Sequence, residues 1–247
     1  MSNEVPIPEA AAELRRRRLI TRIHRPPLCS GKEATVYRCS AHPATGRPDV
    51  ALKIYRPLTE RAFRADTIYR HGRRTGSSRV DRAIDAGSTF GLRCQARQWQ
   101  DWEKRTLALL RAAGADVPEP IALVEGALLM EFIGDDEAAP KLHEAAIEAD
   151  DLAACWLAIR RTVRCALRVD RVHADLSAYN VLWWRGRPIV IDWPQAVDPR
   201  ENDAAERLLR RDLANIAGWF ARRGLDIDHR AEADACWSAW LMGEPLS

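Results

Sequence analysis

Four polar side chains lie close together in the stretch VHADLSAYNVLWW, residues 172–184: His173, Asp175, Ser177 and Asn180. Four residues separate Asp175 from Asn180, the spacing of a phosphoryl-transfer loop in which the aspartate meets an acceptor hydroxyl and the asparagine oxygen binds a metal ion. Short polar residues also form ordinary turns and helix caps, so the cluster alone supports both interpretations. We interpret His173 as a buried, hydrogen-bonded structural histidine rather than a proton-transfer group.

A further carboxylate follows the loop. Asp192 ends the apolar stretch IVID, which we predict to be a strand in a hairpin with the strand after Asn180. Magnesium in proteins is held by one or two carboxylates together with phosphate oxygens. Asn180 and Asp192 are therefore the candidate metal ligands, and the expected metal is Mg²⁺, with Mn²⁺ as an alternative.

Phosphoryl transfer from a nucleotide also needs a lysine on the phosphates and a carboxylate that holds this lysine. Lys53 lies in VALKIY (50–55), a predicted strand in which a lysine is normally avoided unless it is paired. Glu103 lies close to the apolar stripe of a predicted helix and would supply the countercharge that a desolvated lysine needs. The alternative is that Glu103 pairs with a neighbour on a solvated helix face. The turn SGKE (30–33) offers backbone N–H groups to phosphates.

The composition indicates a folded protein and excludes several other classes. Of 247 residues, 47% are hydrophobic, and the formal net charge of +3 is too small to indicate nucleic-acid binding by itself. The six cysteines are scattered, with no CxxC pair and no zinc-ligand spacing. No apolar run approaches the ~20 residues of a membrane span. We therefore expect a cytoplasmic protein with reduced cysteines and no membrane contact.

The hydrophobic pattern predicts a strand-rich region followed by a mostly helical one, an α+β arrangement. The change near 132–140 indicates a hinge between a small β-rich lobe and a larger helical lobe, and ligands favour such junctions. We divide the chain into an N-terminal extension with a short basic helix (1–27), an N-lobe (28–132) with a flexible basic loop (60–95), and a C-lobe (133–247). The predicted strands are 36–37 and 50–55, with hairpins over 121–132 and around 185–186; the predicted helices are 11–23, 96–114, 142–148, 149–170, 203–223 and 229–242.

Six motifs in a fixed order resemble the RIO family of atypical serine/threonine protein kinases, most closely its RIO1-like branch. They are SGKEATVY, ALKIYR, VPEPIAL, LLMEFIG, VHADLSAYNVL and IDWPQAVDP, and the similarity covers about residues 28–223. The resemblance implies a two-lobed protein-kinase-like fold with an ATP cleft and a truncated C-lobe, in which the SGKE turn replaces a Gly-rich loop. It also implies a kinase that uses ATP and magnesium, with autophosphorylation and ATPase turnover as further activities.

The resemblance also implies roles for individual residues. Lys53 would hold the phosphates, paired with Glu103, and Asp175 would be the catalytic aspartate. Asn180 and Asp192 would bind the metal, and Asp192 would carry an aspartyl-phosphate intermediate. The other expected nucleotide-binding residues are Ser30 and Lys32 near the phosphates, Met130 before the hinge, Glu131 and Ile133 at the adenine, and Val36 and Ala51.

Three secondary expectations follow from the same resemblance. Asp212 would support the catalytic loop from below. The metal motif, residues 192–194, is Asp-Trp-Pro instead of D-F-G, so a flipping phenylalanine is not expected. Ser77, Ser78 and Ser88 in the basic loop are candidate autophosphorylation sites.

Two other functions fit parts of the sequence. Small-molecule kinases of the aminoglycoside or choline type share the H-x-D-x-x-x-x-N loop and an IDW metal motif, but they usually have a larger helical substrate pocket than the 55 residues after Asp192 would provide. An ATP-switched binding module on a ribosomal particle would contact RNA through the Arg15–Arg18 run and the basic segment 61–82. The expected partner is accordingly a protein substrate or a ribosomal particle.

Overall fold

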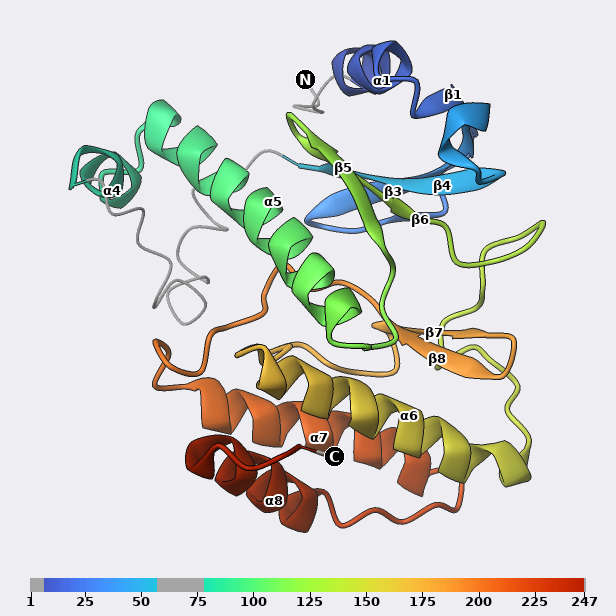
Figure 1. Cartoon of the computed structure of the whole chain (residues 1–247), viewed down its shortest axis with the longest axis vertical. Coiled ribbons are helices and arrows are strands. Elements are labelled where there is room, and N and C mark those ends of the chain that lie inside the picture. Colours follow the sequence, from blue (N-terminus) through green and yellow to red (C-terminus); the bar gives the residue numbers. More distant parts are fainter. Residues whose placement is uncertain (1–6, 57–77, 247) are drawn as a thin grey trace. The chain divides into compact units, whose positions relative to one another are not determined.

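The computed structural model describes residues 7–56 and 78–246, which form two compact units (Figure 1). Unit 1 comprises the described residues up to Arg56, those from Ser78 to Arg105, and Glu119–Ile133. Unit 2 comprises Thr106–Pro118 and the chain from Gly134 onward. The long helix α5 (Thr89–Ala112) contributes residues to both units, so neither unit is one continuous segment of the chain.

Unit 1 is built on a six-stranded sheet in the order β1-β3-β4-β6-β5, with β2 beside β3 and every pair antiparallel. The tight turn between β5 and β6 is made by Gly126, whose φ of 76° is a left-handed conformation that glycine adopts without steric cost. The strands are β1 (Ile20–Ile23), β2 (Cys29–Ser30), β3 (Ala34–Ala41), β4 (Asp49–Tyr55), β5 (Pro120–Val124) and β6 (Ala127–Glu131), and the short helix η1 (Pro43–Thr45) joins β3 to β4.

The two faces of strand β4 lie toward different helices of unit 1. Leu52 and its neighbours at every second position lie in the hydrophobic core of unit 1, which also contains Ala10 and Leu14 of helix α1 (Ile7–Arg16). Because successive side chains of a strand point to opposite faces, Lys53 points away from this core. Its ionic partner comes from α5, so α1 and α5 cover opposite faces of the sheet.

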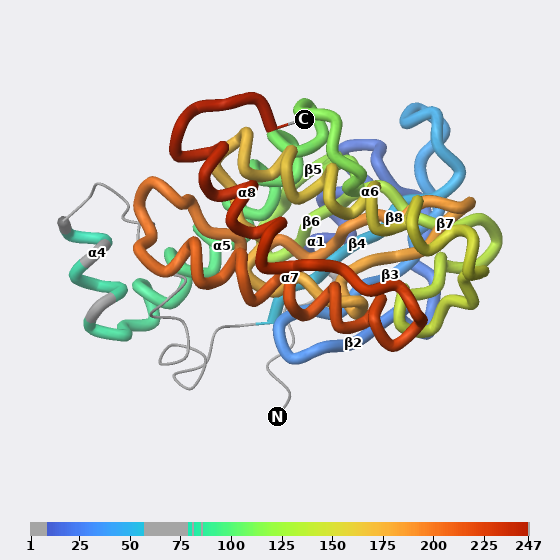
Figure 2. Tube along the Cα trace, turned by 90° about the horizontal axis from the view of Figure 1, so that it is seen from below, coloured from blue at the N-terminus to red at the C-terminus, as the bar shows by residue number. Residues whose placement is uncertain are grey.

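Unit 2 is mainly helical. Its helices α6 (Ala149–Arg168), α7 (Ala205–Ala221) and α8 (His229–Met242) pack side by side, as Figure 2 shows, and bury one stripe each. The hairpin of β7 (Val181–Trp184) and β8 (Arg187–Val190) packs against α6. None of the helices in the described ranges has both the length and the apolar character that crossing a membrane requires. The α+β fold class predicted from the sequence is confirmed.

Three predicted elements differ from the structure. The helix predicted over 11–23 ends at Arg16, and Ile20–Ile23 instead pairs with β3. The side chains of Arg15–Arg18 are exposed. Residues 142–148, all of which the structure describes, are not helical. Their backbone is bonded to β7 instead: Leu142 N–H donates to Val181 O at 2.7 Å.

The third difference concerns the basic loop predicted over 60–95. Residues 57–77, including Ser77, lie outside the described residues, but the remainder is helical: α4 (Ser78–Asp85), and then α5, which begins seven residues before the predicted start at 96. The hydroxyl of Ser88 accepts the Gly91 N–H at 3.0 Å, the bond of a helix N-cap. Ser88 is therefore the N-cap residue that precedes α5.

Candidate active site

A buried ion pair lies between the sheet of unit 1 and α5. The ammonium of Lys53 donates to both carboxylate oxygens of Glu103, at 2.7 and 2.9 Å, and only 5% and 1% of the two residues is exposed. The hydroxyl of Tyr55 donates to the same carboxylate at 2.6 Å, and its ring centroid lies 5.3 Å from the lysine nitrogen. The exposed-surface alternative for Glu103 is thus wrong, because both charges are desolvated and compensate each other.

Several of the residues expected at the nucleotide share one face of the sheet. Val36 lies directly opposite Lys53 on the neighbouring strand, and Ala51 lies directly opposite Met130. Paired residues of an antiparallel sheet point to the same face, and Ala51 is two residues from Lys53, so all four side chains lie on the Lys53 face. This arrangement gives the lysine an apolar surround.

The remaining two residues expected at the adenine are Glu131 and Ile133. Glu131 ends β6, where its N–H donates to Glu119 O at 2.8 Å, and its side chain accepts the Glu119 N–H at 3.1 Å. Ile133 is buried, with 6% of its surface exposed. The end of β6 is therefore bonded to Glu119, the residue before β5, by one backbone bond and one bond to the Glu131 side chain.

The SGKE turn joins β2 to β3. Gly31 N–H donates to Ala34 O at 2.9 Å and closes the turn, which leaves Lys32 exposed at its tip. The guanidinium of Arg56 donates to the Ser30 hydroxyl at 2.9 Å. Two cationic side chains, Lys32 and Arg56, thus lie at this turn together with the exposed carboxylate of Glu33. A turn with one glycine offers fewer N–H groups to phosphates than a Gly-rich loop.

The loop with Asp175 is supported from within unit 2 by helix α7. The carboxylate of Asp212, 1% exposed, accepts the Ala174 N–H at 2.7 Å and the Leu176 N–H at 3.1 Å. Arg211 donates to the Ala174 carbonyl oxygen. Burial raises the pKa of Asp212 to about 7, although the two N–H bonds act in the opposite direction. The side chains of α7 thus hold the backbone on both sides of Asp175.

His173 is a structural residue, as predicted. Its Nδ1 accepts the Asp175 N–H at 3.2 Å, so Nε2 carries the proton that is donated to Ile191 O at 3.0 Å. The imidazole packs against the indole of Trp193, with ring centroids 4.4 Å apart. Burial lowers the pKa of His173 and keeps the ring neutral. His173 therefore joins the Asp175 loop to the segment that carries Asp192.

The side chains of Asp175 and Asn180 are bonded to each other, and the backbone before Asp192 is bonded to Asn180. The Nδ2 of Asn180 donates to the backbone oxygen of Asp175 at 2.8 Å and to its carboxylate at 3.1 Å. The Oδ1 of Asn180 is then the oxygen that a metal can bind. Ile191 N–H donates to Asn180 O at 2.9 Å, which places Asp192 one residue beyond this pair. Ala174 and Asp192 both have left-handed φ values, 65° and 68°, a conformation rare outside glycine and concentrated at functional sites.

The donor set fits magnesium. Carboxylate and amide oxygens are the ligands that this hard cation prefers, and it commonly takes only one or two from the protein. In the described parts of the chain no group of three or more His, Cys, Asp and Glu side chains is placed to hold a metal. Asn180 and Asp192 would thus hold magnesium together with phosphate oxygens, and not as a closed protein site.

Sequence reasoning located the charged residues but missed two of their partners. Tyr55 lies two residues after Lys53 on the same strand face, and this spacing is the signal that could have identified it. Arg211 had no signal, because it is one of many arginines in the chain. The structure brings Lys53 and Glu103 together in unit 1 and the Asp175, Asn180 and Asp192 segments together in unit 2.

Comparison with known proteins identifies relatives of this chain. The family model described as "RIO domain" matches residues 35–233. A RIO-type serine/threonine-protein kinase Rio1 from Haloferax volcanii is 35% identical over 203 residues, covering 82% of this chain and 64% of the relative. The serine/threonine-protein kinase RIO1 of Chaetomium thermophilum is 33% identical over 211 residues, covering 81% of this chain and 39% of that protein. The chain therefore spans less than two thirds of the length of these relatives.

Solved structures show the same fold. A Rio2 kinase–ADP/Mg²⁺–phosphoaspartate complex from Chaetomium thermophilum superposes with a TM-score of 0.64 at 19% identity, covering 95% of this chain and 69% of that one. A second structure of the Rio2 kinase from the same organism gives a TM-score of 0.62. The expected kinase-like fold, with a β-rich N-terminal lobe and a mainly helical C-terminal part, is confirmed.

The Lys53–Glu103 pair predicts a large and specific loss of stability. Glu103→Gln leaves a buried ammonium without its countercharge and should lower the free energy of unfolding by about 3–5 kcal/mol. Tyr55→Phe removes one hydrogen bond to the carboxylate and should cost about 1.5–3 kcal/mol. Denaturant unfolding measures both. As control, Glu13→Gln removes the exposed pairs with Arg16 and Arg17 and should cost about 1 kcal/mol or less. Equal losses for Glu103→Gln and the control would contradict the assignment.

Asp212 predicts a pH dependence of stability. Its folded pKa of about 7 lies above the value of a free aspartate, so the folded protein binds more protons between pH 4 and 7. The resulting stabilisation is complete below pH 4 and is lost as the pH rises to 7, by up to about 1.4 kcal/mol per unit. Asp212→Asn cannot titrate, so the wild-type-minus-variant difference in unfolding free energy should fall over this range. Parallel pH profiles for the two proteins would show that Asp212 does not titrate there.

Proposed function

The chain belongs to the RIO domain family, and on this basis we propose that it is an ATP-dependent serine/threonine protein kinase. The observation that carries the proposal is the supported loop of unit 2, in which Asp175 and Asn180 are bonded to each other above the Asp212 carboxylate. A protein serine or threonine is the proposed acceptor, either on a separate protein or on a ribosomal particle. The small-molecule and binding-module alternatives have no relative among the proteins reported above.

Lys53 would bind the nucleotide phosphates. Its ammonium has three N–H donors, and the two distances to Glu103 show that the carboxylate fixes the direction of the side chain. The apolar residues around it lower the local dielectric, which strengthens attraction to an anion. Glu103 and Tyr55 act through Lys53 and are positioning residues.

Asp175 would orient the acceptor hydroxyl and accept its proton as the phosphoryl group transfers. Its carboxylate is exposed and therefore accessible, while its backbone is fixed on both sides by Asp212 and its side chain is oriented by Asn180. Magnesium held by Asn180 and Asp192 would neutralise charge on the phosphates. Catalysis in this proposal is positioning and electrostatic stabilisation, which requires rigid support of the loop.

Asp192 is the proposed carboxylate for a covalent phosphoaspartate. One related fold was solved with a phosphoaspartate, and the Asp192 segment of this chain carries a carboxylate in a left-handed backbone conformation next to the loop. In such a step the carboxylate oxygen forms a bond to the γ-phosphorus while the bond from that phosphorus to ADP breaks. Hydrolysis of the acyl phosphate by water would then complete ATPase turnover.

The proposal predicts label transfer that depends on Asp175. Wild-type protein incubated with γ-³²P-ATP and Mg²⁺ should become labelled or label a generic protein acceptor. Asp175→Asn should abolish transfer to serine or threonine hydroxyls while ATP binding persists, because the acceptor of the hydroxyl proton is lost. Asp226→Asn changes an exposed aspartate elsewhere in unit 2 and should transfer like wild type. Acid-stable label indicates Ser or Thr, and hydroxylamine-labile label indicates Asp192. Undiminished acid-stable labelling by Asp175→Asn would refute the catalytic assignment, whereas label on Asp192 involves no hydroxyl proton and is not expected to depend on Asp175.

A further inference from the structure

In unit 2, the segment that precedes the candidate catalytic loop pairs with the segment that follows the Asp192 motif. Val172 precedes the loop and Val197 follows the metal motif, and they exchange two backbone hydrogen bonds of 3.0 and 2.9 Å. At the other end of the motif, His173 donates to Ile191 O. The stretch from Asp192 to Val197 is therefore a loop whose two ends are both bonded to the chain that leads into Asp175.

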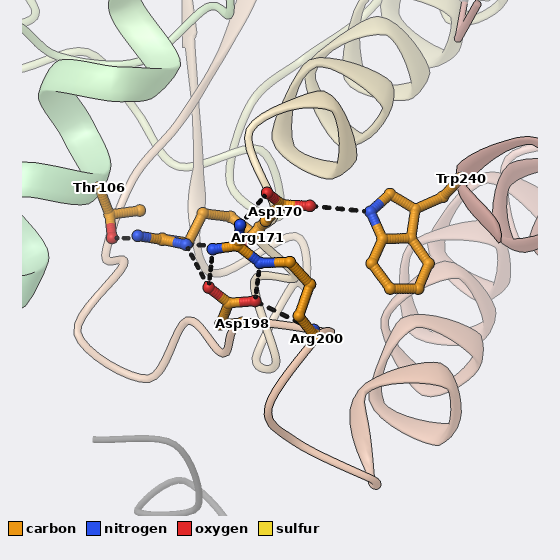
Figure 3. Close-up of polar contacts among 6 residues, drawn as sticks. All are labelled: Thr106, Asp170, Arg171, Asp198, Arg200 and Trp240. Carbon is orange, nitrogen blue, oxygen red and sulfur yellow. Dashed lines mark hydrogen bonds and ion pairs between the residues drawn. The ribbon is translucent and has the colours of Figure 1, made fainter. Parts of the chain in front are cut away.

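A buried ion pair extends this connection by one residue on each side. Arg171 precedes Val172, Asp198 follows Val197, and the guanidinium Nη1 of Arg171 lies 3.3 Å from the Asp198 carboxylate, as Figure 3 shows. Both residues are buried, with 5% and 7% of their surfaces exposed. Arg171 also donates from Nη1 to Asp170 O at 2.6 Å and from Nε to the Thr106 hydroxyl at 3.3 Å. An arginine with this burial cannot reach a substrate, so any role in catalysis acts through the backbone it holds.

Asp198 is the centre of the charge network. Arg200 donates to it with its backbone N–H at 3.0 Å, with Nε at 2.9 Å and with Nη2 at 2.6 Å, and its Nη1 pairs with Asp170 at 3.0 Å. Burial alone would raise the pKa of Asp198, but the bonds and charges of Arg200 and Arg171 outweigh it and lower this pKa. The carboxylate thus stays ionised and keeps its attraction for Arg171.

The network reaches the last helix of the described chain. The indole N–H of Trp240 on α8 donates to the Asp170 carboxylate at 3.0 Å, at the opposite end of the network from Thr106 (Figure 3). Asp170 has a left-handed φ of 54°, a conformation that costs energy in a residue other than glycine and needs surrounding contacts to persist. The contacts with Arg200 and Trp240 provide this support.

We propose that Arg171 is a positioning residue that, through Asp198, holds the Asp175 loop and the Asp192 segment in one fixed arrangement, with Trp240 extending this support to α8. The proposal rests on the proposed phosphotransfer function and adds to it the residue that sets the geometry between the proton acceptor and the metal-binding carboxylate. Removing Arg171 loosens the Val172–Val197 connection and leaves the Asp192 segment bonded to the catalytic loop only at its Ile191 end, through Asn180 and His173. Metal binding is the step most sensitive to such a change, because it depends on two ligands from the two segments.

The test compares Arg171→Met with Arg164→Met. Arg164 is also an enclosed arginine of unit 2, with 14% of its side chain exposed; it pairs with Glu232 at 3.0 Å, and Glu232 keeps a second arginine, Arg160, just as Asp198 keeps Arg200. The control therefore loses a comparable ion pair that contacts neither the Asp175 loop nor the Asp192 segment. Arg171→Lys keeps the charge without the planar fork and provides a milder variant if Arg171→Met does not fold.

Two measurements separate positioning from general stability. Hydrogen exchange on the ligand-free proteins should show loss of protection at the Val172 and Val197 amides in Arg171→Met and not in Arg164→Met. The Mg²⁺ concentration for half-maximal phosphate transfer should rise about 10-fold or more in Arg171→Met, with a smaller rise in Arg171→Lys and no change in the control.

Unchanged protection of the two amides overturns the proposal. Lost protection with a wild-type Mg²⁺ requirement also overturns it, because the role is then structural only. If wild-type protein transfers no phosphate, the proposed function fails, and the exchange data alone decide: protection lost only in the Arg171 variants supports the connection, and protection retained refutes it.

Discussion

Buried charge is the constraint on which both units of this protein depend. A charge removed from water is stable only beside a partner of opposite charge or a set of aligned N–H groups, and that partner then fixes its position. Lys53 meets Glu103 and Arg171 meets Asp198, while the buried Asp212 carboxyl group, whose pKa burial raises to about 7, meets two backbone N–H groups. Each arrangement supports a residue or backbone segment that the proposed chemistry uses.

The candidate proton acceptor Asp175 and the turn residue Lys32 differ in exposure from the residues beneath the Asp175 loop. Asp175 and Lys32 are open to solvent, whereas Asp212, His173 and Trp193 beneath the loop are buried. An exposed carboxylate can meet a protein acceptor, and a buried support restricts its motion without being accessible itself. This division suits a reaction in which the protein contributes mainly orientation and fixed charge.

The sequence predicted the parts of this arrangement in which a charged residue lies in an otherwise apolar strand or beside the apolar stripe of a helix. Lys53 in an apolar strand required a partner, and Glu103 near an apolar stripe supplied it. Asp212 was recognised only through a family resemblance, because an aspartate on an amphipathic helix is ordinarily a surface residue. The Arg171–Asp198 pair joins positions 27 residues apart, and among 34 arginines nothing in the local pattern distinguishes Arg171. The helix predicted over 142–148 is wrong because this segment pairs with β7, a tertiary contact that local periodicity does not contain.

In the proposed function, the supported loop of unit 2 binds a metal–nucleotide complex through Asn180 and Asp192. Calorimetric titration of ATP with and without Mg²⁺, on wild type and on Asp192→Asn, tests it directly. Mg²⁺ should strengthen ATP binding to wild type. Asp192→Asn should lose this gain and bind metal-free ATP no more weakly than wild type, since one negative charge is removed. Equal ATP affinity of wild type with and without Mg²⁺, or a full Mg²⁺ effect in Asp192→Asn, would contradict it.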